Sequence, residues 1–503
     1  MAKLKFGWAE VDLTPDKKVS LAGQFAERIS EYVEKPITAT AMAVTSENEQ
    51  MILVSCDLVS IGANLVDAIR EKLAGNTVGI DPEKVIISAI HTHTGPDYIR
   101  NRRVPLGVAS QKDFLESRLP AGKKYVEKQN VSNNPDVVTK EEMTDILIER
   151  ITAVILEAWA NRKDGSFTNA FGRAPVGMCR RASFSDGSAQ MWGETNQAVF
   201  TALEGGSDTG IELMYVYGEN GELTGIVANL ACPAQCVEHR LFVSPDFWGE
   251  VKVRIRKRFG ENIFLLPQCS AAGDQCPVDL IRWVDPYSDV NDPNINRKYP
   301  VKRKADPSMF DLEGMWLTGR RIANEIIAVY EDGLDAPQED PEFVHHVHDM
   351  KLPLRRVTLA DEIAANKAVD EYLRNLPGDI VDYNDRAKLQ IYAGIIGRMK
   401  DQNKVNVIPT EVHTIRLGTV AIATNPFELF LDYGNQIKAR SNAEQTFLIQ
   451  LANGGEGYLP TEKAEKGGHY SAFVGSGQVG HEGGDMLVRE TLEDINNKLF
   501  PME

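Results

Sequence analysis

One segment near the N-terminus reads as strand, strand, helix and strand, and it limits the fold more than any other part of the sequence. Residues 41–59 form two apolar runs around a polar turn, and residues 62–75 form an amphipathic helix with Leu65 and Ile69 on one face. Residues 85–90 are the next strand. A strand, a crossover helix and a second strand form a β-α-β unit, which needs a sheet covered by helices. We therefore expect an α/β protein with mixed sheets and covering helices.

The rest of the chain repeats this alternation. Two β-hairpins are expected, over 211–232 with Asn220-Gly221 at the turn, and over 411–427 with Leu417-Gly418 at the turn. Periodicity and apolar runs place a strand at 262–270 and helices near 141–162, 247–260, 361–376, 383–401 and 485–498.

Composition and charge exclude several classes of partner. The 503 residues carry a net charge of −17, so nucleic acid and anionic membrane surfaces would be repelled. No apolar run is long enough to span a membrane, and the N-terminus lacks the apolar core of a secretory signal. With only six cysteines, these features predict a cytoplasmic protein. We expect a small-molecule substrate and no membrane insertion. Assembly into a homo-oligomer is compatible with these features.

The chain shows no internal repeat and no low-complexity linker. We expect a single domain over residues 1–503. Two polar insertions, near 98–140 and 281–308, interrupt it. Loops of this length inside a compact domain often serve as functional lids, and an additional interaction surface is the alternative.

The strand at 85–90 ends in His-Thr-His-Thr-Gly-Pro-Asp. Side chains two residues apart in a strand point to the same side, so His91 and His93 face one site. Open α/β sheets bind ligands at this carboxyl end of their strands. Two converging imidazoles suit a metal ion, one as ligand and the other as ligand, acid–base group or hydrogen-bond donor. The alternative is two histidines satisfied by nearby carbonyl groups.

Six short motifs follow one another along the chain. Two are HTHTGP from His91 and GDQCP from Gly273, and the other four are GWAEVDLTP from Gly7, VSCDLV from Val54, NPFELF from Asn425 and NGGEGYLPT from Asn453. In kind and order they resemble motifs of the neutral, non-lysosomal ceramidases and their bacterial relatives. The resemblance covers nearly the whole chain and implies a ceramidase-like catalytic domain. The usual C-terminal immunoglobulin-like domain is expected to be absent, because the sequence stops at Glu503.

The resemblance also implies a metal centre. The family holds one zinc ion with two histidines, a glutamate and a tyrosine. Residue by residue, this assigns His91, Glu428 and Tyr458 as ligands and leaves His93 to steady charge or move a proton. Read without the resemblance, Glu428 would begin a helix after Pro426, where a carboxylate offsets the helix dipole. Tyr458 would then be a buried aromatic side chain.

The sequence departs from the family pattern at two positions. Where the family has its second histidine ligand this chain has Cys232, and a thiolate is a good zinc ligand. His239 on the same loop is the alternative, with Cys236 and Glu238 as weaker candidates. The family's catalytic serine corresponds to Cys276. That thiol would act as a hydrogen-bond donor or as a nucleophile.

Asp274 precedes this cysteine in the Gly-Asp loop and would orient the thiol or anchor the loop. A separate group of histidines, at 345–348, is a rival metal cluster, and we interpret it as part of a solvated edge strand. These assignments predict a zinc-dependent hydrolase that cleaves an amide bond in a soluble, polar substrate. The alternatives are a metal-dependent lyase, isomerase or glycosidase acting on a sugar or polyol, and a binding protein without catalytic activity.

Overall fold

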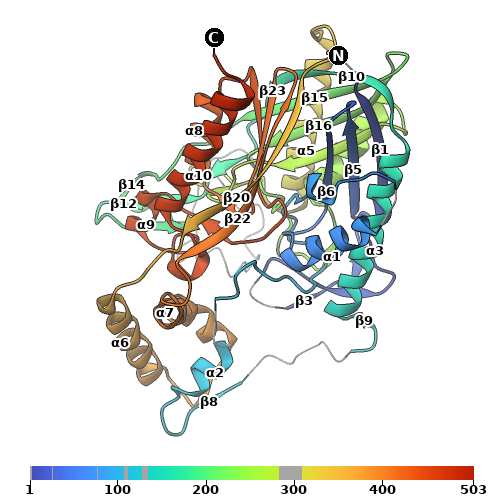
Figure 1. Cartoon of the computed structure of the whole chain (residues 1–503). Helices are drawn as coiled ribbons and strands as arrows, with labels where there is room; N and C mark the ends of the chain where they lie inside the picture. The colour runs from blue at the N-terminus through green and yellow to red at the C-terminus, as the bar shows by residue number, and fades with distance from the viewer. Residues whose placement is uncertain are drawn as a thin grey trace.

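Two β-sheets packed face to face form the centre of the molecule (Figure 1). The computed structural model describes residues 3–24, 27–75, 78–106, 111–126, 134–282 and 309–502. The larger sheet has eight strands, in the order β18 (Phe264–Cys269), β16 (Leu223–Leu230), β15 (Gly210–Gly218), β10 (Lys163–Arg173), β1 (Lys5–Asp12), β5 (Thr38–Thr45), β6 (Gln50–Cys56) and β7 (Val85–Ala89). The smaller sheet has four, in the order β20 (Phe343–Pro353), β22 (Val407–Leu417), β23 (Val420–Thr424) and β25 (Gln445–Ile449).

The space between the sheets is filled by apolar side chains from both. Met42 and Leu53 of the large sheet belong to the same buried cluster as Ile415 and Phe447 of the small sheet. Successive side chains of a strand point to opposite faces. Accordingly Val54, next to Leu53, belongs to a second buried cluster on the outer face.

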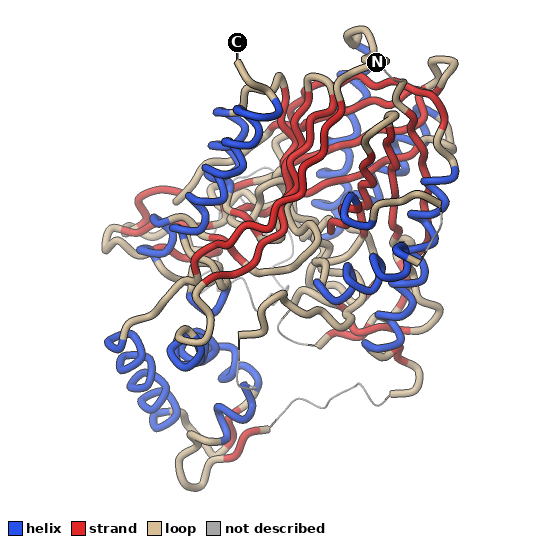
Figure 2. The backbone as a smooth tube through the Cα atoms, viewed as in Figure 1, coloured by secondary structure: helices blue, strands red, loops and turns tan. Residues whose placement is uncertain are grey.

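Helices cover the outer faces, so that strands occupy the centre and helices the outside (Figure 2). One cluster on the large sheet packs against α1 (Ala63–Ala74) and α3 (Lys140–Ala160). Another packs against α4 (Phe247–Phe259) and α5 (Asp311–Glu331). The small sheet is covered by α8 (Leu431–Arg440) and α10 (His481–Asp494). The order of layers is therefore helix, sheet, sheet, helix.

Five further elements form a lobe with a small apolar core of its own, seen beside the layered body in Figure 1. They are α2 (Gln111–Glu116), β8 (Lys124–Tyr125), α6 (Leu359–Asn375), β21 (Ile380–Val381) and α7 (Tyr383–Asp401). β8 pairs in parallel with β21, which brings part of the insertion at 98–140 together with the two helices near 361–401. Of the other insertion, residues 283–308 lie outside the described part of the chain.

The expected α/β class with mixed sheets is confirmed. The strand-helix-strand segment folds as β6, α1 and β7, and β6 pairs in parallel with β7. Both hairpins form, as β15–β16 and β22–β23. The last predicted helix begins earlier than expected, at His481. Within the described ranges, no helix has the length and apolar character needed to cross a membrane.

Candidate active site

The two histidines of the His-Thr-His motif lie just beyond the end of β7, and both are buried. His91 has a left-handed backbone with φ of 67°, which turns the chain sharply after the strand. Its Nδ1 lies 2.7 Å from the Val59 carbonyl oxygen, so Nδ1 carries the proton and donates it. The lone pair of His91 Nε2 therefore points into the site, 3.3 Å from His93 Nε2.

The neighbouring loop fixes the position of His93. A Cβ atom on Gly23 would lie 2.5 Å from the His93 ring, and Gly23 also has a φ of +92°, so only glycine fits there. The buried Arg28 side chain donates to the carbonyl oxygens of His93 and Ala22, at 2.5 and 2.6 Å. The imidazole is thus held by close packing and by the backbone on which it is mounted.

Glu428 and Tyr458 are brought together by a two-stranded parallel ladder. β24 (Glu428–Leu429) pairs with β26 (Tyr458–Leu459), and Glu428 is the direct partner of Tyr458 in the register. The Tyr458 hydroxyl hydrogen-bonds the Glu428 carboxylate. A carboxylate oxygen, Oε2, lies 3.4 Å from His91 Nε2. Glu428 precedes α8, which begins at Leu431, so this carboxylate is not part of that helix.

A buried arginine that the sequence motifs did not indicate completes the group. Arg180 donates to the Tyr458 hydroxyl at 3.1 Å and to the side-chain oxygen of Gln235 at 3.2 Å. This fixes the orientation of the Gln235 amide, whose nitrogen lies 2.8 Å from His93 Nε2. Nothing in the local sequence around Arg180 distinguishes it from Arg181, which is equally buried but pairs with Glu204.

Burial determines the charge state of these groups. It lowers the pKa of His91 and of His93 below the ordinary value, and the positive charges nearby lower the pKa of His93 further. Burial, together with the negative charge of Glu428, raises the pKa of the Tyr458 hydroxyl well above its ordinary value. In the absence of a cation, both imidazoles are therefore neutral and the phenol is protonated.

Cys232 and His239, the two candidates for a further metal ligand, contact residues other than those of the His91 group. The Cys232 thiol donates to the Val176 carbonyl oxygen at 3.4 Å, inside the apolar cluster beneath α4 and α5. His239 stacks on Phe310, and its Nε2 lies 3.6 Å from Asp311. The structure thus joins His91, His93, Glu428 and Tyr458, and it places these two side chains outside that group.

Cys276 and Asp274 both lie in the Gly-Asp loop, and the Cys276 thiol donates to the Val278 carbonyl oxygen at 3.4 Å. Cys276 lies in β19 (Gln275–Cys276), which pairs with β11 (Met178–Cys179) just before Arg180. Burial raises the pKa of its thiol to about 12, although the positive charge of Arg180 opposes this. Asp274 accepts from the Leu431 amide at 2.8 Å and so ties the loop to the start of α8.

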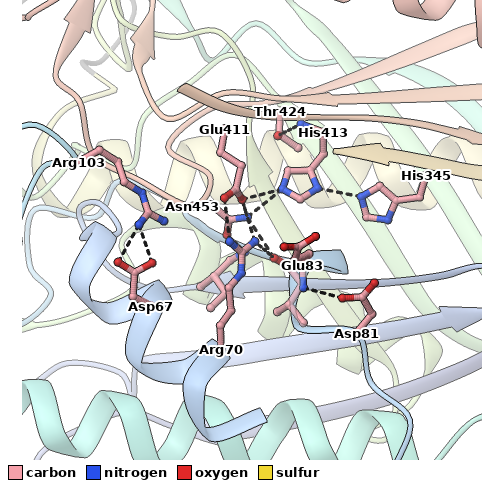
Figure 3. A network of polar contacts seen from close by, with 12 residues as sticks. Asp67, Arg70, Asp81, Glu83, Arg103, His345, Glu411, His413, Thr424 and Asn453 are labelled. Atoms are coloured by element: carbon pink, nitrogen blue, oxygen red, sulfur yellow. Dashed lines mark hydrogen bonds and ion pairs between the residues drawn. The ribbon is translucent and has the colours of Figure 1, made fainter. Parts of the chain in front are cut away.

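Histidines of the 345–348 cluster lie on edge strand β20 and make two separate arrangements. His345 contacts His413 at 2.8 Å in a polar network that includes Glu411, Arg70 and Asn453 (Figure 3). Within the described residues, the one group of three His, Cys, Asp or Glu ligand atoms lying within 4.8 Å of one another is His346, His348 and Asp494.

Each carboxylate oxygen of Asp494 lies close to a basic side chain. Its Oδ2 lies 3.0 Å from His346 and 3.1 Å from His348. Its Oδ1 lies 2.8 Å from the Lys498 ammonium group. A metal ion bound by this cluster would therefore compete with the lysine for the carboxylate.

A cavity of about 510 Å³ opens beside Glu428. Its wall includes Arg100, Arg102, Lys140 and Asp97, from the segment that follows the His-Thr-His motif and from the start of α3. The cavity is therefore polar and charged, and it leads to one of the carboxylate groups of the site.

Comparison with known proteins places the chain among proteins with the fold of the ceramidases. It superposes on the neutral ceramidase from Pseudomonas aeruginosa with a TM-score of 0.66 and 17% identity, over 100% of this chain and 76% of that one. A ceramidase complexed with C2 gives 0.63 and 14%, over 98% and 75%. No family model matches the sequence, and no curated protein matches it either.

Proposed function

We propose that the chain is a zinc-dependent hydrolase that cleaves an amide bond in a soluble, polar substrate. The observation that carries this proposal is a series of contacts in which Glu428 meets both His91 and Tyr458, while His93 lies beside His91 and Arg180 beside Tyr458. The amide bond is chosen because the two similar structures are ceramidases. At such low identity the similarity concerns the fold, so metal-dependent hydrolysis is argued from the site, and the choice of an amide bond is an analogy with those two proteins.

The donor atoms fit a cation. His91 Nδ1 donates its proton to the Val59 carbonyl oxygen, so His91 Nε2 has a free lone pair. His93 Nε2 accepts from the Gln235 amide and therefore also carries a lone pair. These two nitrogen atoms lie 3.3 Å apart. A carboxylate oxygen lies 3.4 Å from the first nitrogen. Such a convergence of electron pairs is unfavourable unless a proton or a metal ion lies among them. Nitrogen and oxygen donors of this kind suit zinc.

His91, Glu428 and Tyr458 are the residues that would hold the ion. Zinc bound there would supply a water of lowered pKa and polarise the substrate carbonyl. Arg180 is in a position to donate to negative charge that develops next to the Tyr458 hydroxyl. His93 is neutral and buried, and its basic nitrogen can accept a proton from an attacking group and return it to the leaving nitrogen.

The proposal is tested by metal analysis together with a substrate panel of N-acyl amino acids, N-acyl amino sugars and glycosides. We expect about one zinc per chain and turnover of N-acyl compounds alone. His93→Gln should retain the zinc and lose about 10²- to 10⁴-fold in kcat, as expected for loss of a general acid–base group. Turnover of glycosides, or full N-acyl turnover by metal-free protein, would contradict the proposal.

A further inference from the structure

Arg102 differs from the cationic side chains around it because no direct partner holds it, although the negative charges of Glu456 and Glu428 act on it from a greater distance. Arg100 pairs with Asp97 at 2.7 Å, and Arg103 pairs with Asp67 at 2.6 Å. Among the described residues, no hydrogen bond or ion pair involves the Arg102 guanidinium, although it lines the same cavity as Glu428. A partly buried guanidinium without a partner is costly, because water solvates it incompletely.

The backbone beside the site is shaped to accept this guanidinium. Its Nη2 lies 2.8 Å from the position that a Cβ atom would take on Gly457. Gly457 has a φ of +81° and immediately precedes Tyr458, so the absence of a side chain lets Arg102 lie against the turn that carries a proposed zinc ligand. Arg102 therefore occupies the cavity next to the reacting groups.

The charges of the cavity wall do not balance. Arg100, Arg102 and Lys140 face two carboxylates, Asp97 and Glu428. Asp97 is already held between Arg100 at 2.7 Å and Lys140 at 2.6 Å. Glu428 is committed to His91 and Tyr458. Among the cationic side chains of this wall, Arg102 is thus the one that makes no direct ion pair with a described carboxylate.

Glu456 is the one nearby group that offers a purely structural role for Arg102. Its Oε2 is buried without a hydrogen bond, and its Oε1 accepts from the Arg103 amide at 2.9 Å. Glu456 and Arg102 attract each other electrostatically, but no hydrogen bond or ion pair joins the two side chains in the described part of the chain. An ion from outside the chain is then the better partner.

We propose that Arg102 binds an anionic oxygen group of the substrate, a carboxylate or a phosphate. A guanidinium makes paired, charge-assisted hydrogen bonds to either group. The inference rests on the proposed function and narrows it to N-acyl compounds with a negative charge close to the amide. Neutral N-acyl compounds would leave the guanidinium unpaired.

The test compares ligands that differ in charge alone, using calorimetry on the zinc-loaded full chain. One pair is N-acetylglycine and N-acetylglycinamide, and the other is N-acetyl-phosphoethanolamine and N-acetylethanolamine. We expect the anionic member of at least one pair to bind about tenfold more tightly, as for a hydrogen bond to a charged group. The preferred pair distinguishes a carboxylate from a phosphate.

Variants separate recognition from structure. Arg102→Gln should abolish the preference, Arg102→Lys should keep part of it, and Arg103→Gln, the matched control, should leave it intact. Equal affinity for both members of both pairs, or a preference that survives in Arg102→Gln, would overturn the inference. Because binding and hydrolysis are measured in separate experiments, a preference without hydrolysis would contradict the proposed reaction alone. Hydrolysis without a preference would contradict the role of Arg102 alone.

Discussion

At the scale of single residues, His91 Nε2 lies close to two other electron-pair donors. These are His93 Nε2 at 3.3 Å and a Glu428 carboxylate oxygen at 3.4 Å. We expect His91→Ala and Glu428→Ala each to reduce the zinc content from about one per chain to near zero. His348→Ala is the matched control, because a metal ion in its cluster would compete with Lys498 for Asp494. Elemental analysis of the purified variants measures this. Loss of zinc from His348→Ala, but not from His91→Ala, would show that the metal is bound by the cluster around Asp494 instead.

Cys232 can be tested in the same preparations after cobalt substitution. Its thiol points to the Val176 carbonyl oxygen, so we expect the cobalt protein to lack a sulfur-to-metal charge-transfer band. The absorption spectrum between the near ultraviolet and the visible measures this. A band that disappears in Cys232→Ala would show that the thiol turns toward the metal.

The raised pKa of Cys276 favours a hydrogen-bond donor over a nucleophile, because the thiolate is scarce at neutral pH. Cys276→Ser should therefore keep most of the activity. Cys276→Ala should lose about 10²-fold in kcat, as for removal of a donor to a developing oxyanion. Steady-state kinetics measures both. A covalent adduct on Cys276, seen by intact mass after acid quench during turnover, would establish the nucleophile instead.

Sequence motifs identified His91, His93, Glu428 and Tyr458, the four side chains that the fold brings together. His91 and His93 follow from the strand end on which they lie, whereas Glu428 and Tyr458 were assigned only through the resemblance to the ceramidases. Arg180 could not be found in this way. Its place in the site depends on the pairing of β11 with β19, and such long-range pairing leaves no periodic signal in the local sequence.

At the scale of elements, a polar network joins α1 and β7 to the small sheet (Figure 3). Arg70 and His413 both bond Glu411, at 2.8 and 2.9 Å. Asn453 donates to Glu411 at 2.7 Å and accepts from the β7 amide of Ile87 at 2.8 Å. Asn453 begins the segment that leads to Tyr458, so the network connects both halves of the site.

Glu411→Gln should lower the free energy of unfolding by about 1.5–3 kcal/mol at pH 7, as for the loss of hydrogen bonds to a charged group. Burial raises the pKa of Glu411, but hydrogen bonds from His413 and Arg70 outweigh it and lower the pKa below the ordinary value. A lowered pKa contributes stability above the unfolded value of about 4.3 and loses it as the pH falls further. Urea unfolding should show the difference between variant and wild type shrinking below about pH 4. A difference that is constant from pH 7 to pH 3 would exclude the network as its source.

The sequence predicted individual strands and helices better than it predicted which strands pair with one another. β6, α1 and β7 follow from apolar runs, and both hairpins follow from turn residues such as Gly221 and Gly418, which have positive φ. The pairing of β24 with β26 was not predictable, because two-residue strands carry no alternation. Yet this ladder sets the register of Glu428 against Tyr458.

At the scale of the whole molecule, the sequence predicted one domain, and the structure adds a lobe whose core is separate from the layered body. Leu115 of α2, Leu373 of α6 and Leu389 of α7 lie in this core. The lobe could not be foreseen, because its members come from residues 111–126 and 359–401 and meet through the pairing of β8 with β21. The segment 98–106, which carries Arg102, leads from the site toward it.

A core of its own implies that the lobe opens as a cooperative unit of low stability. Leu373 is fully buried, and Leu373→Ala should destabilise the lobe by about 2–5 kcal/mol. Hydrogen exchange read by mass spectrometry should then accelerate in 111–126 and 359–401 together, while β22 and β23 keep their protection. Ile415→Ala, a matched deletion between the two sheets, should accelerate exchange in β22 and β23. Uniform acceleration over the chain in Leu373→Ala would show that lobe and body unfold as one unit.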